Sequence, residues 1–189
     1  MVENEQDLIG LADVLDPERR LHVAAPRGPL QLPGWPGHHW YVVPRVGYPD
    51  PKTFYAAYEE LALLHASLWR RLELKPAQTV LGGFSMGAVM SYALGLGPAS
   101  PAPAGILAFS GFVPTVEGWQ PDLPRPTRVF IAHGRGDPVM QIDFAREAYR
   151  LLEGSGMDVE YHESDGGHWI EPAHAALATE WLGSTLAGS

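Results

Sequence analysis

The chain has 189 residues, a length typical of one domain, and its formal net charge at neutral pH is −9. Hydrophobic residues make up 46% of it, enough for a core, and the acidic balance gives no electrostatic footprint for nucleic-acid binding. The absence of cysteine excludes disulfides, thiolate metal ligands and a cysteine nucleophile. Neither a membrane-spanning apolar run nor a signal-peptide pattern is found, so we expect a cytoplasmic protein with no membrane span.

The first fifty residues predict little regular structure. Apolar residues at helical spacing predict a short amphipathic helix over residues 4–15, and the run 21–26 predicts a short buried strand that ends at Pro26. Residues 27–52 are too rich in proline and glycine for regular structure and too aromatic for a solvated linker. We therefore expect an ordered loop that packs over the body of the domain.

From residue 50 onward, predicted helices and strands alternate. Asp50 and Pro51 are typical of a helix N-cap and first turn, and this helix ends before Pro76. Further strands are predicted at residues 79–84, 105–109, 128–132 and 158–162. The helices that follow are predicted at residues 86–94, 138–153 and 171–186. This alternation indicates a single α/β domain over residues 1–189, with a mostly parallel central sheet and helices on both faces.

Residues 83–87, GFSMG, match the pattern G-x-S-x-G between an apolar run and an apolar helical segment. In such a tight strand-to-helix turn the serine hydroxyl is pushed out of the sheet, and the next N–H group is free to stabilise an oxyanion. We therefore expect Ser85 to be a nucleophile and the backbone N–H of Met86 to be an oxyanion donor. An ordinary glycine-rich turn is the alternative interpretation.

A serine nucleophile needs a base, and the base needs an acid that orients it. Asp137 follows the predicted strand 128–132 and His168 follows the predicted strand 158–162, so both lie where parallel strands end. The chain order serine, acid, histidine is that of an α/β-hydrolase triad. The alternatives are a helix cap at Asp137 and a structural hydrogen bond at His168.

Other candidate site residues carry a weaker signal. Several large apolar side chains on loops near the same sheet edge predict a substrate-binding pocket, with core packing as the alternative. These residues are Trp35, Trp119, Met140 and Trp169. For His133 the position at a strand end favours a structural bond to backbone, and for His174 the helical stretch favours a surface position. The histidines and carboxylates lack the arrangement of a metal site, so we expect no metal.

Four segments together resemble a known family: GGFSMGAVMSYAL, GFVPTVEGW, IAHGRGDPVM and SDGGHWI. They resemble the carboxylesterase/phospholipase group of α/β-hydrolases, which includes acyl-protein thioesterase-like enzymes. The resemblance implies a hydrolase of carboxylic ester or thioester bonds that needs neither metal nor cofactor. It also implies that Ser85, Asp137 and His168 form the triad and that Met86 supplies an oxyanion N–H.

The beginning of the chain departs from that family's pattern. Members of the group begin with further strands, and a His-Gly loop after the last of these supplies the second oxyanion N–H. The segment NEQDLIGLADVL resembles the helix just after that loop. We therefore expect an N-terminally truncated α/β-hydrolase with one oxyanion donor and weak activity. Either the run 21–26 pairs directly with the predicted strand 79–84, or both present unpaired backbone edges.

The expected function is cleavage of small-molecule carboxylic esters with short- to medium-chain acyl groups, through an acyl-enzyme on Ser85. Thioesterase and lysophospholipase activities stay open within the same mechanism. The alternative from another class is a catalytically degenerate fold that binds an acyl ligand or a partner without turnover. The oligomeric state is also open, a dimer included.

Overall fold

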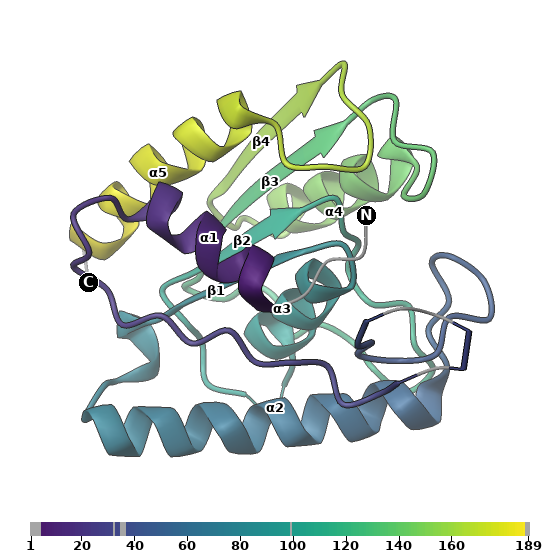
Figure 1. The fold of residues 1–189 in the computed structure, drawn as a ribbon, viewed down its shortest axis with the longest axis horizontal. Helices are drawn as coiled ribbons and strands as arrows, with labels where there is room; N and C mark the ends of the chain where they lie inside the picture. Colours follow the sequence, from purple (N-terminus) through teal and green to yellow (C-terminus); the bar gives the residue numbers. More distant parts are fainter. Residues whose placement is uncertain (1–4, 32, 35–36, 99, 188–189) are drawn as a thin grey trace.

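The computed structural model describes residues 5–31, 33–34, 37–98 and 100–187 (Figure 1). The helices are α1 (Glu5–Leu15), α2 (Pro51–Leu72), α3 (Met86–Leu96), α4 (Ile142–Gly154) and α5 (Pro172–Ala187), and a short 3₁₀ helix, η1, spans Pro76–Gln78. The strands are β1 (Val80–Phe84), β2 (Gly105–Phe109), β3 (Arg128–Gly134) and β4 (Val159–Ser164). This order of elements is that of an α/β domain, as the sequence predicts.

The four strands form one sheet in the order β1-β2-β3-β4, and each neighbouring pair is parallel. All five residues of β2 are buried, which explains why this strand is a continuous apolar run without alternation. The carboxyl ends of the strands lie at one edge, because Phe84 pairs with Phe109, Phe109 with Ala132, and Ala132 with His162. The predicted parallel sheet is thus confirmed.

Helices cover both faces of the sheet (Figure 1). On one face α3 packs on β1 and β2, α4 packs on β3 and β4, and α2 lies against α3. On the other face α5 packs on β3, and α1 packs on α5. Two separate apolar clusters result, one on each face of the sheet, and the larger one lies under α2, α3 and α4. This layering keeps the sheet dry and leaves the strand ends as the place for polar chemistry.

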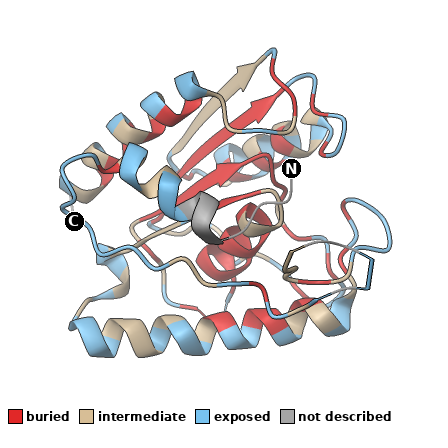
Figure 2. Ribbon diagram, in the orientation of Figure 1, coloured by how far each residue is buried: buried red, intermediate tan, exposed pale blue. Residues whose placement is uncertain are grey.

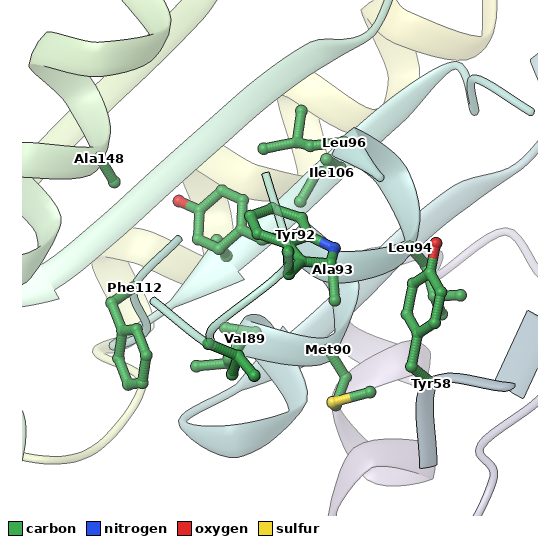
Figure 3. Packing of buried hydrophobic residues seen from close by; sticks show 14 of the residues in the cluster. Tyr58, Val89, Met90, Tyr92, Ala93, Leu94, Leu96, Ile106, Phe112 and Ala148 are labelled. Atoms are coloured by element: carbon green, nitrogen blue, oxygen red, sulfur yellow. The ribbon is translucent and has the colours of Figure 1, made fainter. Parts of the chain in front are cut away.

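Helix α3 is the centre of the larger cluster. Every residue from Ala88 to Leu96 is buried, which is the red part of α3 in Figure 2. Figure 3 shows Tyr92 of α3 near Ile106 of β2, and Met90 near Tyr58 of α2. A helix that is apolar on all sides is stable only when it is packed on all sides. The burial therefore fixes the position of the N-terminus of α3, where Ser85 lies.

The strand predicted at residues 21–26 does not form, and that prediction was wrong. The described structure of this segment contains no strand, and Leu21 and Val23 are exposed. The segment instead forms one wall of a cavity of about 410 Å³, whose other walls include β1 and α2. The lining of the cavity is mainly apolar and includes Leu61, Leu68 and Leu81. An extended apolar segment becomes a strand only when a neighbouring strand is in reach to pair with its backbone.

The edge of β1 that faces away from β2 is open. Thr79 and Ser85 direct their backbone groups towards β2, because the Thr79 carbonyl accepts from Ala104 and the Ser85 N–H donates to Phe109. Parallel strands use alternate residues for each neighbour, so Val80, Gly82 and Phe84 direct theirs the other way. Among the described residues no strand pairs with them on that side. β1 is therefore an unprotected edge beside an apolar cavity.

Residues 37–50 form the loop that the composition predicts. Tyr41 is 1% exposed and packs against Phe54 of α2. At the end of the loop, Asp50 accepts a hydrogen bond from the Thr53 N–H at 2.9 Å, so it caps α2 as predicted. None of the helices in the described part of the chain is long and apolar enough to cross a membrane.

Candidate active site

Ser85 lies in a strained turn between β1 and α3. Its backbone angles are φ 54° and ψ −119°, a positive φ that is uncommon for a residue other than glycine. Gly83 has no room for a side chain, because a Cβ there would overlap the backbone of Gly87. At Gly87 itself a Cβ would meet nothing within 4 Å. The first glycine of G-x-S-x-G is thus required by the turn, whereas the second faces open space.

His168 links the serine to a carboxylate. Its Nε2 lies 3.1 Å from Ser85 Oγ, and its Nδ1 lies 2.7 Å from Oδ2 of Asp137. A carboxylate only accepts, so Nδ1–H donates to Asp137, and the bare Nε2 of the neutral ring then accepts from the serine hydroxyl. The ring of Phe84 lies 4.6 Å from the imidazole centroid and packs against it. This arrangement can take a proton from Ser85 and hold the resulting charge next to Asp137.

Asp137 is held at its own turn as well as by His168. Its side chain is fully buried, and Oδ1 accepts from the N–H groups of Val139 at 2.8 Å and Met140 at 2.7 Å. These bonds displace the predicted helix start, because residues 137–140 form a turn and α4 begins only at Ile142. Asp137 therefore caps its own turn through Oδ1 and contacts His168 through Oδ2.

The loop that carries Asp137 is joined to the loop that carries His168 by direct backbone bonds. The Arg135 N–H donates to the Ser164 carbonyl at 2.7 Å, and the Gly136 N–H donates to the Gly166 carbonyl at 2.8 Å. At Gly134 a Cβ would overlap the Gly166 backbone. A glycine is thus needed for the close approach of the two loops, which brings acid and base within hydrogen-bond distance.

A comparison with known proteins agrees with this geometry. A profile of the phospholipase/carboxylesterase family matches residues 49–185, which hold β1 to β4, the serine turn and both loops. The chain belongs to the phospholipase/carboxylesterase family. The family resemblance of the sequence motifs is thereby confirmed.

Individual proteins are similar to the chain in sequence or in fold. The chain is 27% identical to acyl-protein thioesterase 1 of Debaryomyces hansenii over 161 residues, which are 81% of this chain and 65% of that protein. It is 27% identical to the putative hydrolase MhqD of Bacillus subtilis over 178 residues, 94% of this chain and 86% of that protein. The Bacillus cereus carboxylesterase superposes with a TM-score of 0.84 at 25% identity, covering 97% of this chain and 84% of that chain.

In this phospholipase/carboxylesterase chain, Met86 is the first residue of α3. The first N–H groups of a helix have no partner within the helix, and the helix dipole makes its N-terminus favourable for negative charge. The N–H groups of Ala88 and Val89 are occupied by the Ser85 carbonyl. Met86 directly follows Ser85 and precedes them in the chain, so its N–H lies in the first turn of α3, at the position that the sequence predicts for an oxyanion donor.

The predicted substrate-binding residues are not gathered in one place. Trp169 follows His168 directly and is 54% exposed, and its Nε1–H donates to Glu171. Met140 is buried in the core cluster and belongs to the Asp137 turn. Trp119 is also buried, and its indole nitrogen lies near the position of Gly97 at the C-terminal end of α3, the opposite end from Ser85. Trp35 lies outside the described residues.

Two further histidines, His174 and His133, can be compared with the sequence predictions. His174 was predicted at the surface, but it is only 4% exposed, because its face of α5 packs against the sheet. His133 has the backbone bond that was predicted, from Nε2 to the Met140 carbonyl at 2.7 Å. Burial lowers the pKa of both histidines. Among the described residues no cluster of histidines and carboxylates could hold a metal ion.

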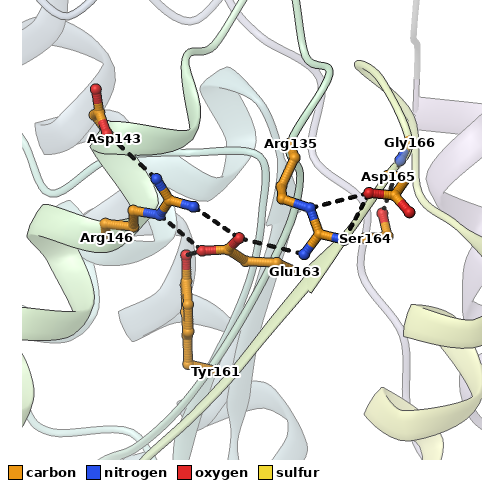
Figure 4. Close-up of polar contacts among 8 residues, drawn as sticks. All are labelled: Arg135, Asp143, Arg146, Tyr161, Glu163, Ser164, Asp165 and Gly166. Carbon is orange, nitrogen blue, oxygen red and sulfur yellow. Dashed lines mark hydrogen bonds and ion pairs between the residues drawn. The ribbon is translucent and has the colours of Figure 1, made fainter.

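Next to the triad loops lies an ionic network that the sequence did not reveal (Figure 4). Arg135 of the acid loop binds Asp165 of the base loop at 2.6 Å. Glu163 lies between two guanidinium groups, 2.8 Å from Arg146 and 3.6 Å from Arg135. The hydrogen bonds from Arg146 are the main reason that the pKa of Glu163 is lowered to about 2. The paired residues are far apart in the sequence, and they meet because β3 pairs with β4 and α4 packs on both strands.

Proposed function

We propose that this protein is a serine hydrolase that cleaves small-molecule carboxylic esters with short- to medium-chain acyl groups. The observation that carries the proposal is the hydrogen-bonded chain from Ser85 Oγ through His168 to the buried carboxylate of Asp137. A strained serine at a strand-to-helix turn, a neutral histidine and an oriented acid are the parts that nucleophilic catalysis requires. Membership of a family of esterases and phospholipases supports the same reaction class.

The mechanism follows from which atoms carry protons. His168 Nε2 takes the hydroxyl proton of Ser85 as Oγ attacks the ester carbonyl, and the carbonyl oxygen becomes an oxyanion that the Met86 N–H stabilises. The imidazolium donates its Nδ1–H to Asp137 and gives its new proton to the departing alcohol. Water then attacks the acyl-enzyme with His168 as base, which releases the acid and restores Ser85.

The substrate class is drawn from the relatives and from the surface near the triad. One relative is named a carboxylesterase and another an acyl-protein thioesterase, and both bond types pass through an acylated serine. Trp169 and Val139 are exposed apolar side chains that directly follow or closely follow His168 and Asp137. They offer apolar contact to an acyl or alcohol group next to the reacting atoms, and neither residue carries a charge that would select an ionic substrate.

A second candidate function rests on a separate observation. The apolar cavity of about 410 Å³ beside the open edge of β1 is lined in part by Gly83 and Gly87, the two glycines of the serine turn. An acyl chain held there would lie beside Ser85 without requiring turnover. A binding module of this kind would fold in the same way and bind an acyl ligand, but it would not hydrolyse esters.

Turnover of p-nitrophenyl butyrate and p-nitrophenyl octanoate by the wild type and by Ser85→Ala separates the two functions. If the protein is a hydrolase, the rate of ester hydrolysis by Ser85→Ala should fall to the uncatalysed background, while the circular dichroism spectrum of this variant is unchanged. Ser155→Ala is the matched control, because the Ser155 hydroxyl donates to the Leu152 carbonyl at the end of α4, outside the serine turn and the cavity lining, and this variant should keep most of the rate. Equal rates for the wild type and Ser85→Ala would reject the hydrolase. Tight binding of octanoate without turnover would then favour the binding module.

A further inference from the structure

His133 touches the proposed triad without belonging to it. It lies on β3 with a side chain that is 0% exposed, as is that of Asp137. Its Nε2 is 2.7 Å from the Met140 carbonyl and 3.4 Å from Oδ2 of Asp137, the same oxygen that binds His168. A carbonyl only accepts, so Nε2 must carry the proton. The ring is therefore the Nε2–H tautomer, and its donor is used to hold the turn that contains Asp137.

The bond from His133 closes a small ring of contacts. The Met140 carbonyl accepts from His133, while the Met140 N–H donates to Oδ1 of Asp137. His133 thus holds Met140 through its carbonyl group, and Met140 in turn holds the Asp137 carboxylate through its N–H group. Without that bond, the turn from 137 to 140 keeps the carboxylate only by two amide contacts within four residues of chain.

The other nitrogen of His133 argues that the ring stays neutral. Nδ1 is buried and has no hydrogen-bond partner among the residues that the structure describes, so a proton there would put an uncompensated charge in the core. Burial is also the main reason that the pKa of His133 is lowered. The ionisable groups that act on it are Asp137, His168, Glu163 and His174. A neutral His133 leaves Asp137 to a single cation, the imidazolium that His168 forms during the reaction.

We propose that His133 is a positioning residue of the hydrolase, whose neutral Nε2–H donor holds the turn 137–140 so that Asp137 presents Oδ2 to His168. The inference rests on the proposed function, since it assigns the orientation of the triad acid. It predicts that the rate of hydrolysis depends on the hydrogen-bond donor at Nε2 of His133 and not on the ability of this imidazole to accept a proton. Glutamine carries an amide donor at about the place of Nε2, whereas methionine fills a similar volume without a donor.

The test compares His133→Met, His133→Gln and the wild type, with His174→Met as the matched loss of a buried histidine that does not contact Asp137. His133→Met should lower kcat for p-nitrophenyl butyrate by about 10- to 100-fold with little change in KM, since misplacement of a reacting group has effects of this size. The acidic limb of its pH–rate profile should move to lower pH, because a loosely held Asp137 stabilises the imidazolium less. His133→Gln should recover most of the rate, and His174→Met should lower stability without moving the limb.

Proton NMR of the His168 Nδ1–H gives a readout that does not need turnover. The downfield resonance of this proton should persist in the wild type and in His133→Gln and be lost in His133→Met. Wild-type kcat in His133→Met, an unmoved pH limb with the resonance intact, or a His133→Gln as impaired as His133→Met would overturn the inference. A wild type no faster than Ser85→Ala would instead reject the proposed function, and the resonance would still decide the role of His133.

Discussion

The two sides of the sheet differ in how completely they are built. At β3 and β4 the loops that carry Asp137 and His168 are joined by backbone bonds and by the Arg135–Asp165 ion pair. At the opposite side, β1 has an unpaired edge, and the segment 21–26 lies beyond a cavity without forming a strand. All three side chains of the proposed triad depend on the first side and on the serine turn. The triad geometry thus forms although β1 has no strand partner on its outer side among the described residues.

The difference follows from what each kind of interaction needs. Ser85, Asp137 and His168 are placed by consecutive parallel strands whose pairing and burial lie within residues 79–168. An oxyanion site needs at least two converging donors for full effect, and the Met86 N–H is the one donor that we propose from the serine turn. The β1 side is therefore where activity and stability are expected to be sensitive to what covers the strand, and the β3–β4 side is where bonds between the two loops hold the acid and the base.

The largest expected effect is at Asp137, on the β3–β4 side of the sheet. Asp137→Asn should lower kcat by about 10⁴-fold, because an amide cannot hold His168 in the tautomer that leaves Nε2 free. Hydrolysis of p-nitrophenyl butyrate measures it. Asp165→Asn is the matched control, since Asp165 is exposed and bonds only to Arg135, and it should stay within a few-fold of the wild type. Equal losses in both variants would mean that the acid of the triad has been misassigned.

The second effect compares stability on the two sides. Phe130 of β3 is fully buried, so Phe130→Ala should lower the free energy of unfolding by about 3–5 kcal/mol. Val23 in the segment 21–26 is 55% exposed, and Val23→Ala should change it by about 0.5 kcal/mol or less. Urea denaturation measures both. A loss at Val23 as large as that at Phe130 would show that the segment is packed in solution and that the β1 side is closed by something else.

Amide hydrogen exchange tests the open edge directly. The Ser85 N–H donates to the Phe109 carbonyl at 2.9 Å, whereas Gly82 directs its N–H away from β2. The Gly82 amide should therefore exchange about 100-fold faster than the Ser85 amide in the folded protein. Protection of Gly82 equal to that of Ser85 would reveal a strand paired to β1. Protection that appears only at high protein concentration would identify that strand as part of another copy of the chain.

The smallest effect is the pH dependence of stability from the buried histidines. Burial lowers the pKa of His133 and His174 in the folded protein below the unfolded value of about 6.5. Below that pH the unfolded chain binds protons that the folded chain refuses, so stability falls as the pH decreases from about 6.5. Each histidine contributes a slope of at most about 1.4 kcal/mol per pH unit. Urea denaturation at pH 7.5 and 5.5 should show the loss, and His174→Gln should reduce it; an unchanged loss would exclude His174 as a source.

Much of the arrangement of the candidate site was predictable from the sequence because it depends on local patterns. The turn of residues 83–87 and the positions of Asp137 and His168 just after apolar runs place all three at one edge of a parallel sheet. The start of α2 was predictable from Asp50 and Pro51 for the same reason, since a helix cap is a local signal.

What was not predictable depends on long-range pairing. The segment 21–26 has the composition of a strand, but a strand requires a neighbour, which sequence composition does not supply. Trp119 was expected near the strand ends and lies at the far end of α3, since hydrophobicity indicates burial and not location. The burial of His174 depends on which face of α5 meets the sheet. A backbone bond was predicted for His133, but its partner, the Met140 carbonyl, depends on which loop packs against β3.

Labelling with a fluorophosphonate probe measures whether Ser85 is an activated nucleophile. Such a probe reacts with a serine whose hydroxyl proton is taken by an adjacent base. The triad geometry predicts one adduct per chain, located by mass spectrometry at Ser85, with labelling strongly reduced in Asp137→Asn and absent in Ser85→Ala. A folded wild-type protein that forms no adduct, or forms it at another serine, would contradict the assignment of the Ser85–His168–Asp137 chain as the catalytic machinery.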